Sequence, residues 1–235
     1  MEKSVFRFKQ FGVAHDKCAM KVNTDGVLLG AWGDVSEAKR ILDVGTGTGV
    51  IALMMAQKNA IAEIHAIDVD NDAYLQAKEN FENSLWASRL TSFHSSLQEF
   101  NPGMKYDVII SNPPYFIDDL KTSSHRKNVA KHTVALTYEE LLSGISRLLA
   151  DNGRVLLVLP VFNLAVFRKI ANEYRLFVTG LTEVTAVAGK APYLLMLQLE
   201  QSEKDILNSS LTIQHAVENF TEEYKMMTKD FYLKF

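Results

Sequence analysis

Short apolar runs and segments with helical spacing alternate along most of this chain. The runs are typical of buried strands, and the stretches between them repeat their apolar positions about every three to four residues, as amphipathic helices do. Strand followed by helix, repeated, predicts a doubly wound, mostly parallel α/β sheet with its ligand at the carboxyl ends of the strands. The predicted strands are 41–44, 63–68, 89–93, 106–111 and 154–160, followed by an antiparallel pair at 177–187 and 193–199, and the predicted helices are 50–57, 70–83, 137–150 and 162–174.

The two ends of the chain depart from this alternation. Aromatic and polar residues alternate over 6–13, which predicts a strand, with 20–22 as a candidate partner. Turn and capping residues at 23–26 predict the start of a helix that runs to Trp32. The last part is polar until an aromatic cluster at 230–233, which we expect to dock on the body. We predict one domain, with an N-terminal strand and helix extension at 1–36, a Rossmann-like core at 37–200 and a C-terminal tail at 201–235.

The composition is that of an ordinary soluble globular protein, with 47% hydrophobic and 23% charged residues. No apolar run has the length of a membrane span, and no signal segment opens the chain. The single cysteine, Cys18, excludes an intrachain disulfide, and the six histidines lack metal-ligand spacing. We therefore expect a cytoplasmic protein without a metal. The net charge of −3 means that any nucleic-acid binding needs a local basic patch.

A glycine-rich turn follows the first predicted strand of the core. Asp43 lies in that strand, and Gly45, Gly47 and Gly49 follow it before a helix. Glycines let a ligand approach the backbone closely, and a helix N-terminus offers free N–H groups. The spacing lacks the third glycine of the dinucleotide fingerprint, which disfavours nicotinamide and flavin cofactors. An acid before the glycines suits a ligand with a cationic amino group, such as a methionine moiety.

Three other places in the chain carry candidate ligand contacts. Asp68 ends the second strand of the core, at the offset where nucleoside-binding α/β folds place an acid on the ribose hydroxyls. Thr24 and Asp25 are equally consistent with helix capping and with a ligand contact. The residues 94–96, after the third strand, lie where an adenine ring is expected.

The sequence Asn112-Pro113-Pro114-Tyr115 follows the fourth strand and is the most specific signal in the chain. Two prolines fix their own φ angles, lack N–H donors, and hold the preceding Asn112 in an extended conformation. A side-chain amide, a backbone carbonyl and an aromatic ring are thereby presented on a stiff segment. This arrangement suits the binding of a flat group that carries an amino nitrogen.

A stretch of about twenty residues without periodicity comes next, at 116–135. Long unpatterned loops inside compact domains are more often functional than accidental. This stretch is locally basic, although the chain as a whole is acidic, and a solvated run of charge without a partner is the alternative reading. Its candidate substrate-binding residues are Phe116, Lys121, Arg126, Lys127 and Lys131.

These motifs, in this order, resemble the Rossmann-like S-adenosylmethionine-dependent methyltransferases that act on planar amino nitrogens. The resemblance covers nearly the whole chain. The opening at 9–26, the segment 112–116 and the closing 230–233 are similar to the bacterial tRNA1(Val) adenine-N6-methyltransferase family. Many relatives carry an acid after the third strand that accepts from the cofactor's adenine amino group. Here His94, Ser95 and Ser96 occupy that region, with Ser96 or backbone as the candidate substitute.

The resemblance implies a sheet of seven strands, the last antiparallel, and methyl transfer from S-adenosylmethionine to N6 of the adenine beside the anticodon of a tRNA. It implies that Asn112 and Pro113 accept the two N–H groups of the amine, while Tyr115 stacks on the base and Phe116 flanks it. The lysines and Arg126 of the basic stretch would hold phosphates. The cofactor would be bound by the first strands and by the helix start at Thr24 and Asp25, through the residues Asp43, Gly45, Gly47, Gly49, Asp68, Thr24, Asp25 and Asn112.

Other reactions share the Asn-Pro-Pro-Tyr signature. The main alternative is an rRNA base methyltransferase acting on guanine N2 or adenine N6. A DNA enzyme usually needs an added recognition domain, for which the chain has no room. A protein-glutamine N5 methyltransferase would need a peptide groove and no basic patch. A cofactor-binding RNA module without catalysis is the alternative from another class, and the presence of Asn112 argues against it.

Overall fold

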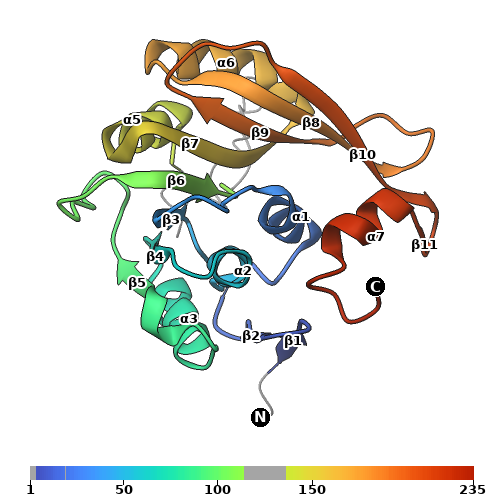
Figure 1. Cartoon of the computed structure of the whole chain (residues 1–235), viewed down its shortest axis with the longest axis horizontal. Helices are drawn as coiled ribbons and strands as arrows, with labels where there is room; N and C mark the ends of the chain where they lie inside the picture. Colours follow the sequence, from blue (N-terminus) through green and yellow to red (C-terminus); the bar gives the residue numbers. More distant parts are fainter. Residues whose placement is uncertain (1–3, 19, 114–135) are drawn as a thin grey trace, which may run out of the picture.

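The computed structural model of the protein describes residues 4–18, 20–113 and 136–235. Its centre is a twisted sheet flanked by helices on both faces (Figure 1). The strands are β1 (Val5–Arg7), β2 (Gly12–Ala14), β3 (Arg40–Val44), β4 (Glu63–Asp68), β5 (Leu90–His94), β6 (Tyr106–Ser111), β7 (Leu149–Pro160), β8 (Phe177–Val187), β9 (Leu194–Glu200), β10 (Leu207–Ala216) and β11 (Asn219–Phe220). The helices are α1 (Thr24–Trp32), α2 (Val50–Lys58), α3 (Asn71–Glu82), α5 (Tyr138–Leu148), α6 (Leu164–Glu173) and α7 (Glu222–Thr228), with short 3-10 turns η1 (Ala87–Arg89) and η2 (Val161–Asn163).

The large sheet has the order β11-β10-β8-β9-β7-β6-β3-β4-β5 among the described residues. Strands β5, β4, β3, β6 and β7 are parallel neighbours, and β9 runs antiparallel between β7 and β8. The strand order reverses between β3 and β6, because the chain adds β4 and β5 on one side of β3 and β6 and β7 on the other. Doubly wound sheets bind their ligands at this point, outside the carboxyl ends of the strands. The class of fold is therefore as predicted, including the antiparallel strand that follows the parallel ones.

The sheet is longer than the predicted seven strands. Strand β10 pairs parallel with β8, and β11 folds back antiparallel on β10. Both come from the segment 201–235, which was expected to be a polar C-terminal tail and for which no strand was predicted. Most of β10 is solvent-exposed, so its sequence lacks the clean alternation of a half-buried strand and gives a weak signal.

Two hydrophobic cores fill the space between the sheet and its helices. One lies under α1, α2, α3 and α7, and the other lies under α5 and α6 (Figure 1). Helix α5, which packs on the second core, begins with a capping box. The Thr137 hydroxyl accepts from the backbone N–H of Glu140, and the Glu140 carboxylate accepts from the backbone N–H of Thr137. No helix in the described ranges is long and apolar enough to cross a membrane.

The two ends of the chain pack on each other. The predicted strand 6–13 is instead the hairpin of β1 and β2, and residues 20–22 are not a strand. The backbone N–H of Lys9 donates to Phe231 at 2.8 Å, and its ammonium donates to the carbonyls of Lys229 and Phe235. Aromatic rings from both ends stack there, and Phe8 lies 5.9 Å from Tyr232 between ring centroids. The opening and closing motifs thus have a shared structural role.

Candidate functional site

The glycine turn after β3 forms an open cradle. Gly45 and Gly47 have φ angles of 70° and 55°, and a Cβ atom at either would meet nothing within 4 Å among the described residues. Gly49 differs, because a Cβ there would lie 2.5 Å from the ring of Phe81. Close packing against α3 therefore accounts for Gly49, whereas the first two glycines leave space for a ligand beside the backbone.

Asp43 lies beneath this cradle and is completely buried. One carboxylate oxygen accepts from the hydroxyl of Thr46 at 2.6 Å, and the other has no partner of full hydrogen-bond geometry among the described residues. Burial raises the pKa of Asp43 to about 7, because removal from water disfavours the charged form. The backbone N–H of Ala52 interacts with this carboxylate and lowers its pKa, but less than burial raises it. A cationic amino group is the kind of partner that this oxygen lacks.

Asp68 reaches the same loop from the end of β4. Its carboxylate accepts from the backbone N–H of Gly47 at 2.8 Å and from that of Asp70 at 2.9 Å. Burial raises its pKa, although these two N–H donors oppose the rise. Asp70 caps α3 as predicted, by accepting from the backbone N–H of Asp72 and Ala73. The two predicted cofactor acids, Asp43 and Asp68, therefore both bind the glycine loop, at Thr46 and at Gly47.

The start of α1 lies against the end of β6. Asn23 is the cap of α1, so Thr24 and Asp25 occupy its first turn and are not its capping residues. Asn112 follows β6, and its Nδ2 lies 3.5 Å from the position that a Cβ of Gly26 would take. β6 is the parallel neighbour of β3, and the Ser111 hydroxyl donates to the Val44 carbonyl at 2.9 Å. The predicted catalytic amide is thus next to the glycine cradle.

Several predicted residues fall outside the described part of the chain. Pro113 is described and buried, and it follows Asn112 directly. The remaining residues of the signature and the basic stretch, for which the roles stay predictions, are Pro114, Tyr115, Phe116, Lys121, Arg126, Lys127 and Lys131.

Sequence reasoning missed a buried amide that joins the N-terminal segment to the cradle. The Asn80 side chain donates to the carbonyls of Ala14 and Thr48 and accepts from the N–H of Ala14. Gln76, one turn earlier on α3, accepts from the N–H of Lys17. Polar residues four apart on the buried side of a helix were the available signal. These bonds hold the segment that precedes Cys18 against α3. Burial raises the pKa of the Cys18 thiol to about 12.

The end of β5 gives no free acceptor at Ser96. Its hydroxyl donates to the Glu99 carboxylate at 3.0 Å and accepts from the Glu99 N–H. His94 contacts the carbonyl of Val69, and the N–H of Ser95 donates to the Asp68 carbonyl. Ser96 is therefore engaged in a local turn, which makes backbone the better candidate for an adenine contact.

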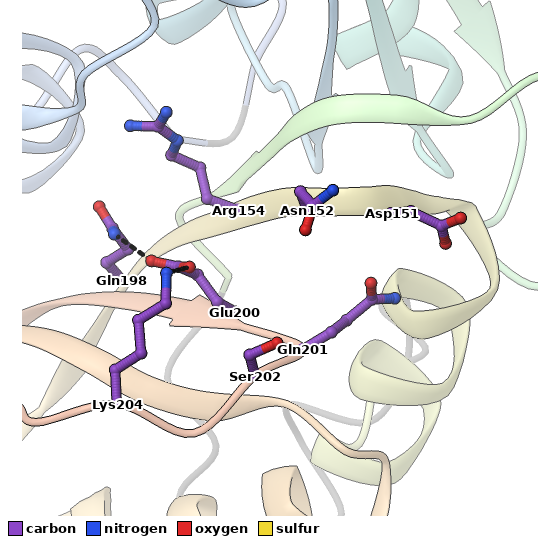
Figure 2. Close-up of a pocket in the computed structure, with 8 residues that line it drawn as sticks. All are labelled: Asp151, Asn152, Arg154, Gln198, Glu200, Gln201, Ser202 and Lys204. Carbon is purple, nitrogen blue, oxygen red and sulfur yellow. Dashed lines mark hydrogen bonds and ion pairs between the residues drawn. The ribbon is translucent and has the colours of Figure 1, made fainter.

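A polar hollow of about 420 Å³ lies elsewhere, at the start of β7 and the end of β9 (Figure 2). It lies at the amino end of β7, which is the opposite end of the parallel strands from Asn112. Its lining mixes both signs of charge, and its Glu200 carboxylate already accepts from Lys204, Gln198 and Thr179. The chemistry of the cradle and of Asn112 lies away from this hollow.

Comparison with known proteins agrees with the geometry. The methyltransferase small domain family matches residues 25–165. The tRNA1(Val) (adenine(37)-N6)-methyltransferase of Parabacteroides distasonis is 45% identical to this chain, over 100% of both chains. The protein of the same name from Pseudoalteromonas translucida is 41% identical, over 98% of this chain and 99% of the relative. A "predicted O-methyltransferase" from Agrobacterium tumefaciens has a similar structure, with a TM-score of 0.70 at 15% identity over 88% of this chain and 96% of that one.

Fold, glycine cradle and family match together define a class I, Rossmann-like S-adenosylmethionine-dependent methyltransferase. Within this class, the chain belongs to the tRNA1(Val) (adenine(37)-N6)-methyltransferase family.

The open cradle predicts a specific effect of adding one methyl group. Gly47→Ala and Gly103→Ala both place alanine at a positive φ, and neither new Cβ meets an atom within 4 Å in the part of the chain that the structure describes. We expect each to lower the free energy of unfolding by about 1–2 kcal/mol. Only Gly47→Ala should weaken S-adenosylmethionine binding, by about tenfold or more, as measured by calorimetric titration. Equal affinities of the two variants would remove Gly47 from the cofactor site.

Asp43 predicts opposite effects on stability and binding. Its pKa is 3.8 in an unfolded chain and about 7 in the ligand-free protein, so the folded state holds an extra proton between these values. This contribution to stability is lost as pH rises through the window. Asp43→Asn should therefore stabilise the ligand-free protein at pH 8 by about 1–3 kcal/mol but not at pH 4. Cofactor affinity should fall. Urea unfolding at both pH values and titration at pH 8 test this, and a variant destabilised at pH 8 would contradict it.

Proposed function

We propose that the protein transfers a methyl group from S-adenosylmethionine to the exocyclic N6 of adenine 37 in the anticodon loop of tRNA1(Val). The observation that carries the proposal is the position of Asn112 at the carboxyl end of β6, beside the strand that leads into the glycine cradle. Relatives named for this reaction match the chain over its full length. The cytoplasm, where tRNA is modified, is the proposed location.

The described residues fit the proposed cofactor. Gly45 and Gly47 leave room beside the backbone, and the unpartnered oxygen of Asp43 suits an amino acid ammonium group. Asp68 would exchange its bond to Gly47 N–H for ribose hydroxyls or share the two. When bound, S-adenosylmethionine supplies a methyl group on a cationic sulfur, which keeps the electron pair of the broken bond.

Asn112 and Pro113 would prepare the acceptor amine. The side-chain carbonyl of Asn112 and the backbone carbonyl of Pro113 each accept one N–H of the N6 group. The nitrogen lone pair, delocalised into the ring of a free adenine, is then directed toward the methyl carbon. These contacts strengthen as the nitrogen becomes pyramidal and positive, so they stabilise the transition state more than the ground state. The surplus amine proton can leave to solvent after transfer, which removes the need for a general base.

The substrate loop has to deliver an unstacked adenine. Bases of an unpaired anticodon loop leave their stack at low cost, and sequence-specific RNA recognition commonly uses such loops. Tyr115 would stack on the target base and Phe116 would flank it. Methylation of in vitro transcripts tests the proposal: one N6-methyladenosine per tRNA1(Val) transcript is expected, and none when adenine 37 is replaced by guanine. Methylation of guanine, of rRNA fragments alone, or of a glutamine peptide would favour another acceptor.

Removing charges from the basic stretch 116–135 should weaken tRNA binding without slowing methyl transfer. Arg126→Ala combined with Lys127→Ala should weaken tRNA binding and lower the slope of log affinity against log salt, because fewer counterions are released. The single-turnover rate at saturating tRNA should stay near that of wild type. Binding assays at several salt concentrations measure both quantities. An unchanged salt slope would remove these two residues from the tRNA interface.

A further inference from the structure

Two exposed aromatic residues next to the transfer site have no role in the proposed chemistry. Phe162 lies in η2, directly after β7, and is 74% exposed, and Tyr193 lies directly before β9 and is 39% exposed. Pro160 pairs with Leu194 in the sheet, and the N–H of Val161 donates to the Tyr193 carbonyl at 3.3 Å. The two aromatics therefore come from adjacent segments at the carboxyl end of β7.

Both segments are fixed by hydrogen bonds. On one side of Phe162, Val161 is bound to Tyr193, and on the other side the buried Asn163 donates to the Tyr138 hydroxyl at 2.7 Å. Tyr193 is held by its own N–H on the Val184 carbonyl at 3.0 Å and by its hydroxyl, which donates to Asp25 at 3.0 Å. Burial raises the pKa of Tyr193, so the hydroxyl remains protonated as the donor. Rings on fixed backbone lose little freedom when a ligand stacks on them.

Tyr193 is also connected to the catalytic amide. Asp25 is in the first turn of α1, and its neighbour Gly26 is the residue that lies against Asn112. β7 is the parallel neighbour of β6, with Leu157 opposite Ser111. Both aromatic residues therefore lie at the same end of the sheet as Asn112, beyond the carboxyl ends of β6 and β7. The turn before Tyr193, residues 188–192, carries the exposed Lys190 and no acid, which suits an anionic ligand.

We propose that Phe162 and Tyr193 form a stacking wall for an unpaired RNA base next to the target adenine. The inference rests on the proposed function. Exposed aromatic rings beside a cation are the features by which proteins hold single-stranded nucleic acid, because every base presents a π-face for stacking. Extruding one adenine leaves the neighbouring base without its stacking partner, and the wall supplies a replacement. Tyr193 acts as the fixed side of the wall through its bond to Asp25.

The inference is tested by combining protein variants with altered RNAs and asking whether their effects on binding affinity depend on each other. The probe is an anticodon stem-loop RNA, intact or with an abasic nucleotide on either side of the target adenine. Wild type should bind the intact RNA about tenfold tighter than one of the two abasic RNAs, within the range measured for base–aromatic stacking. Phe162→Ala and Tyr193→Ala should each remove most of this preference and leave affinity for that abasic RNA unchanged. Phe162→Trp, which keeps a ring, should retain most of it, and Tyr193→Phe, which keeps the ring but lacks the hydroxyl that donates to Asp25, should retain part of it.

Leu207→Ala is the matched control, since Leu207 is 78% exposed but lies at the start of β10, at the end of the sheet opposite to the carboxyl end of β7. It should bind every RNA as wild type does. Variants at Phe162 and Tyr193 that weaken intact and abasic RNA equally, or that change neither, would overturn the inference. If wild type methylates the intact stem-loop but shows no coupling, only the stacking wall is wrong. If wild type methylates no tRNA or stem-loop, the proposed function and the wall both fail.

Discussion

Asn112→Ala should lower the single-turnover rate of methyl transfer at least about a hundredfold and leave S-adenosylmethionine affinity within about threefold of wild type. Removal of one preorganised partner of the transition state has an effect of this size. The cradle at Gly45 and Gly47 and the carboxylate of Asp68 are untouched by the change. The defect should therefore persist at saturating cofactor and saturating tRNA. Quenched-flow measurement of labelled methyl transfer gives the rate, and calorimetric titration gives the affinity.

Asn208→Ala is a suitable control for this variant. Asn208 is exposed on β10, and within the described ranges its side chain donates only to the nearby Ile206 carbonyl. Its rate should equal that of wild type. An Asn112→Ala protein that methylates normally would show that the amine is bound elsewhere. A variant that loses cofactor binding together with the rate would place Asn112 in the cofactor site alone.

Asp68→Ala should weaken cofactor binding by about 1–3 kcal/mol, which corresponds to roughly five- to 150-fold in Kd. The change removes the acceptor proposed for the ribose hydroxyls and also leaves the N–H of Gly47 without its carboxylate partner. Loop order and ligand contact are lost together. The rate at saturating cofactor should change much less than the affinity, because Asp68 does not contact the acceptor amine.

Asp34→Ala controls for the loss of an acid in general. Asp34 pairs with Arg154, far from the glycine cradle, and both side chains are partly exposed. Its Kd for S-adenosylmethionine should match that of wild type. Asp68 would be excluded from the site by an unchanged dissociation constant in the Asp68→Ala protein.

Helices and strands were predictable from sequence where a clear hydrophobic pattern ends at a polar or capping residue. The bounds 63–68 and 106–111 coincide with β4 and β6, because buried parallel strands are nearly continuous apolar runs that end at a polar residue. The capping box at Thr137 and Glu140 defined the start of α5. Beyond residue 200 the pattern fails. β10 is an edge-region strand with mostly exposed side chains, and its place beside β8 depends on tertiary pairing that periodicity does not encode.

The same contrast holds within the site. Asp43 is the last residue but one of β3, Asp68 ends β4 and Asn112 follows β6, so topology alone brings them to the carboxyl end of the parallel strands. Gly49 could not be separated from Gly45 and Gly47 by spacing, because its packing against Phe81 depends on α3. Asn23, and not Thr24 or Asp25, caps α1, and all three residue types suit such a turn. Asn80 bridges segments 66 and 32 residues away in sequence, which no local pattern indicates.

The central claim is best tested by nucleoside mass spectrometry of tRNA1(Val) from a strain that lacks this protein, with the gene restored as wild type or as Asn112→Ala. We expect N6-methyladenosine at position 37 to be absent in the deletion strain, to return with wild type, and to stay absent or nearly absent with Asn112→Ala at equal protein level. Unchanged N6-methyladenosine in the deletion strain, or full restoration by Asn112→Ala, would contradict the account.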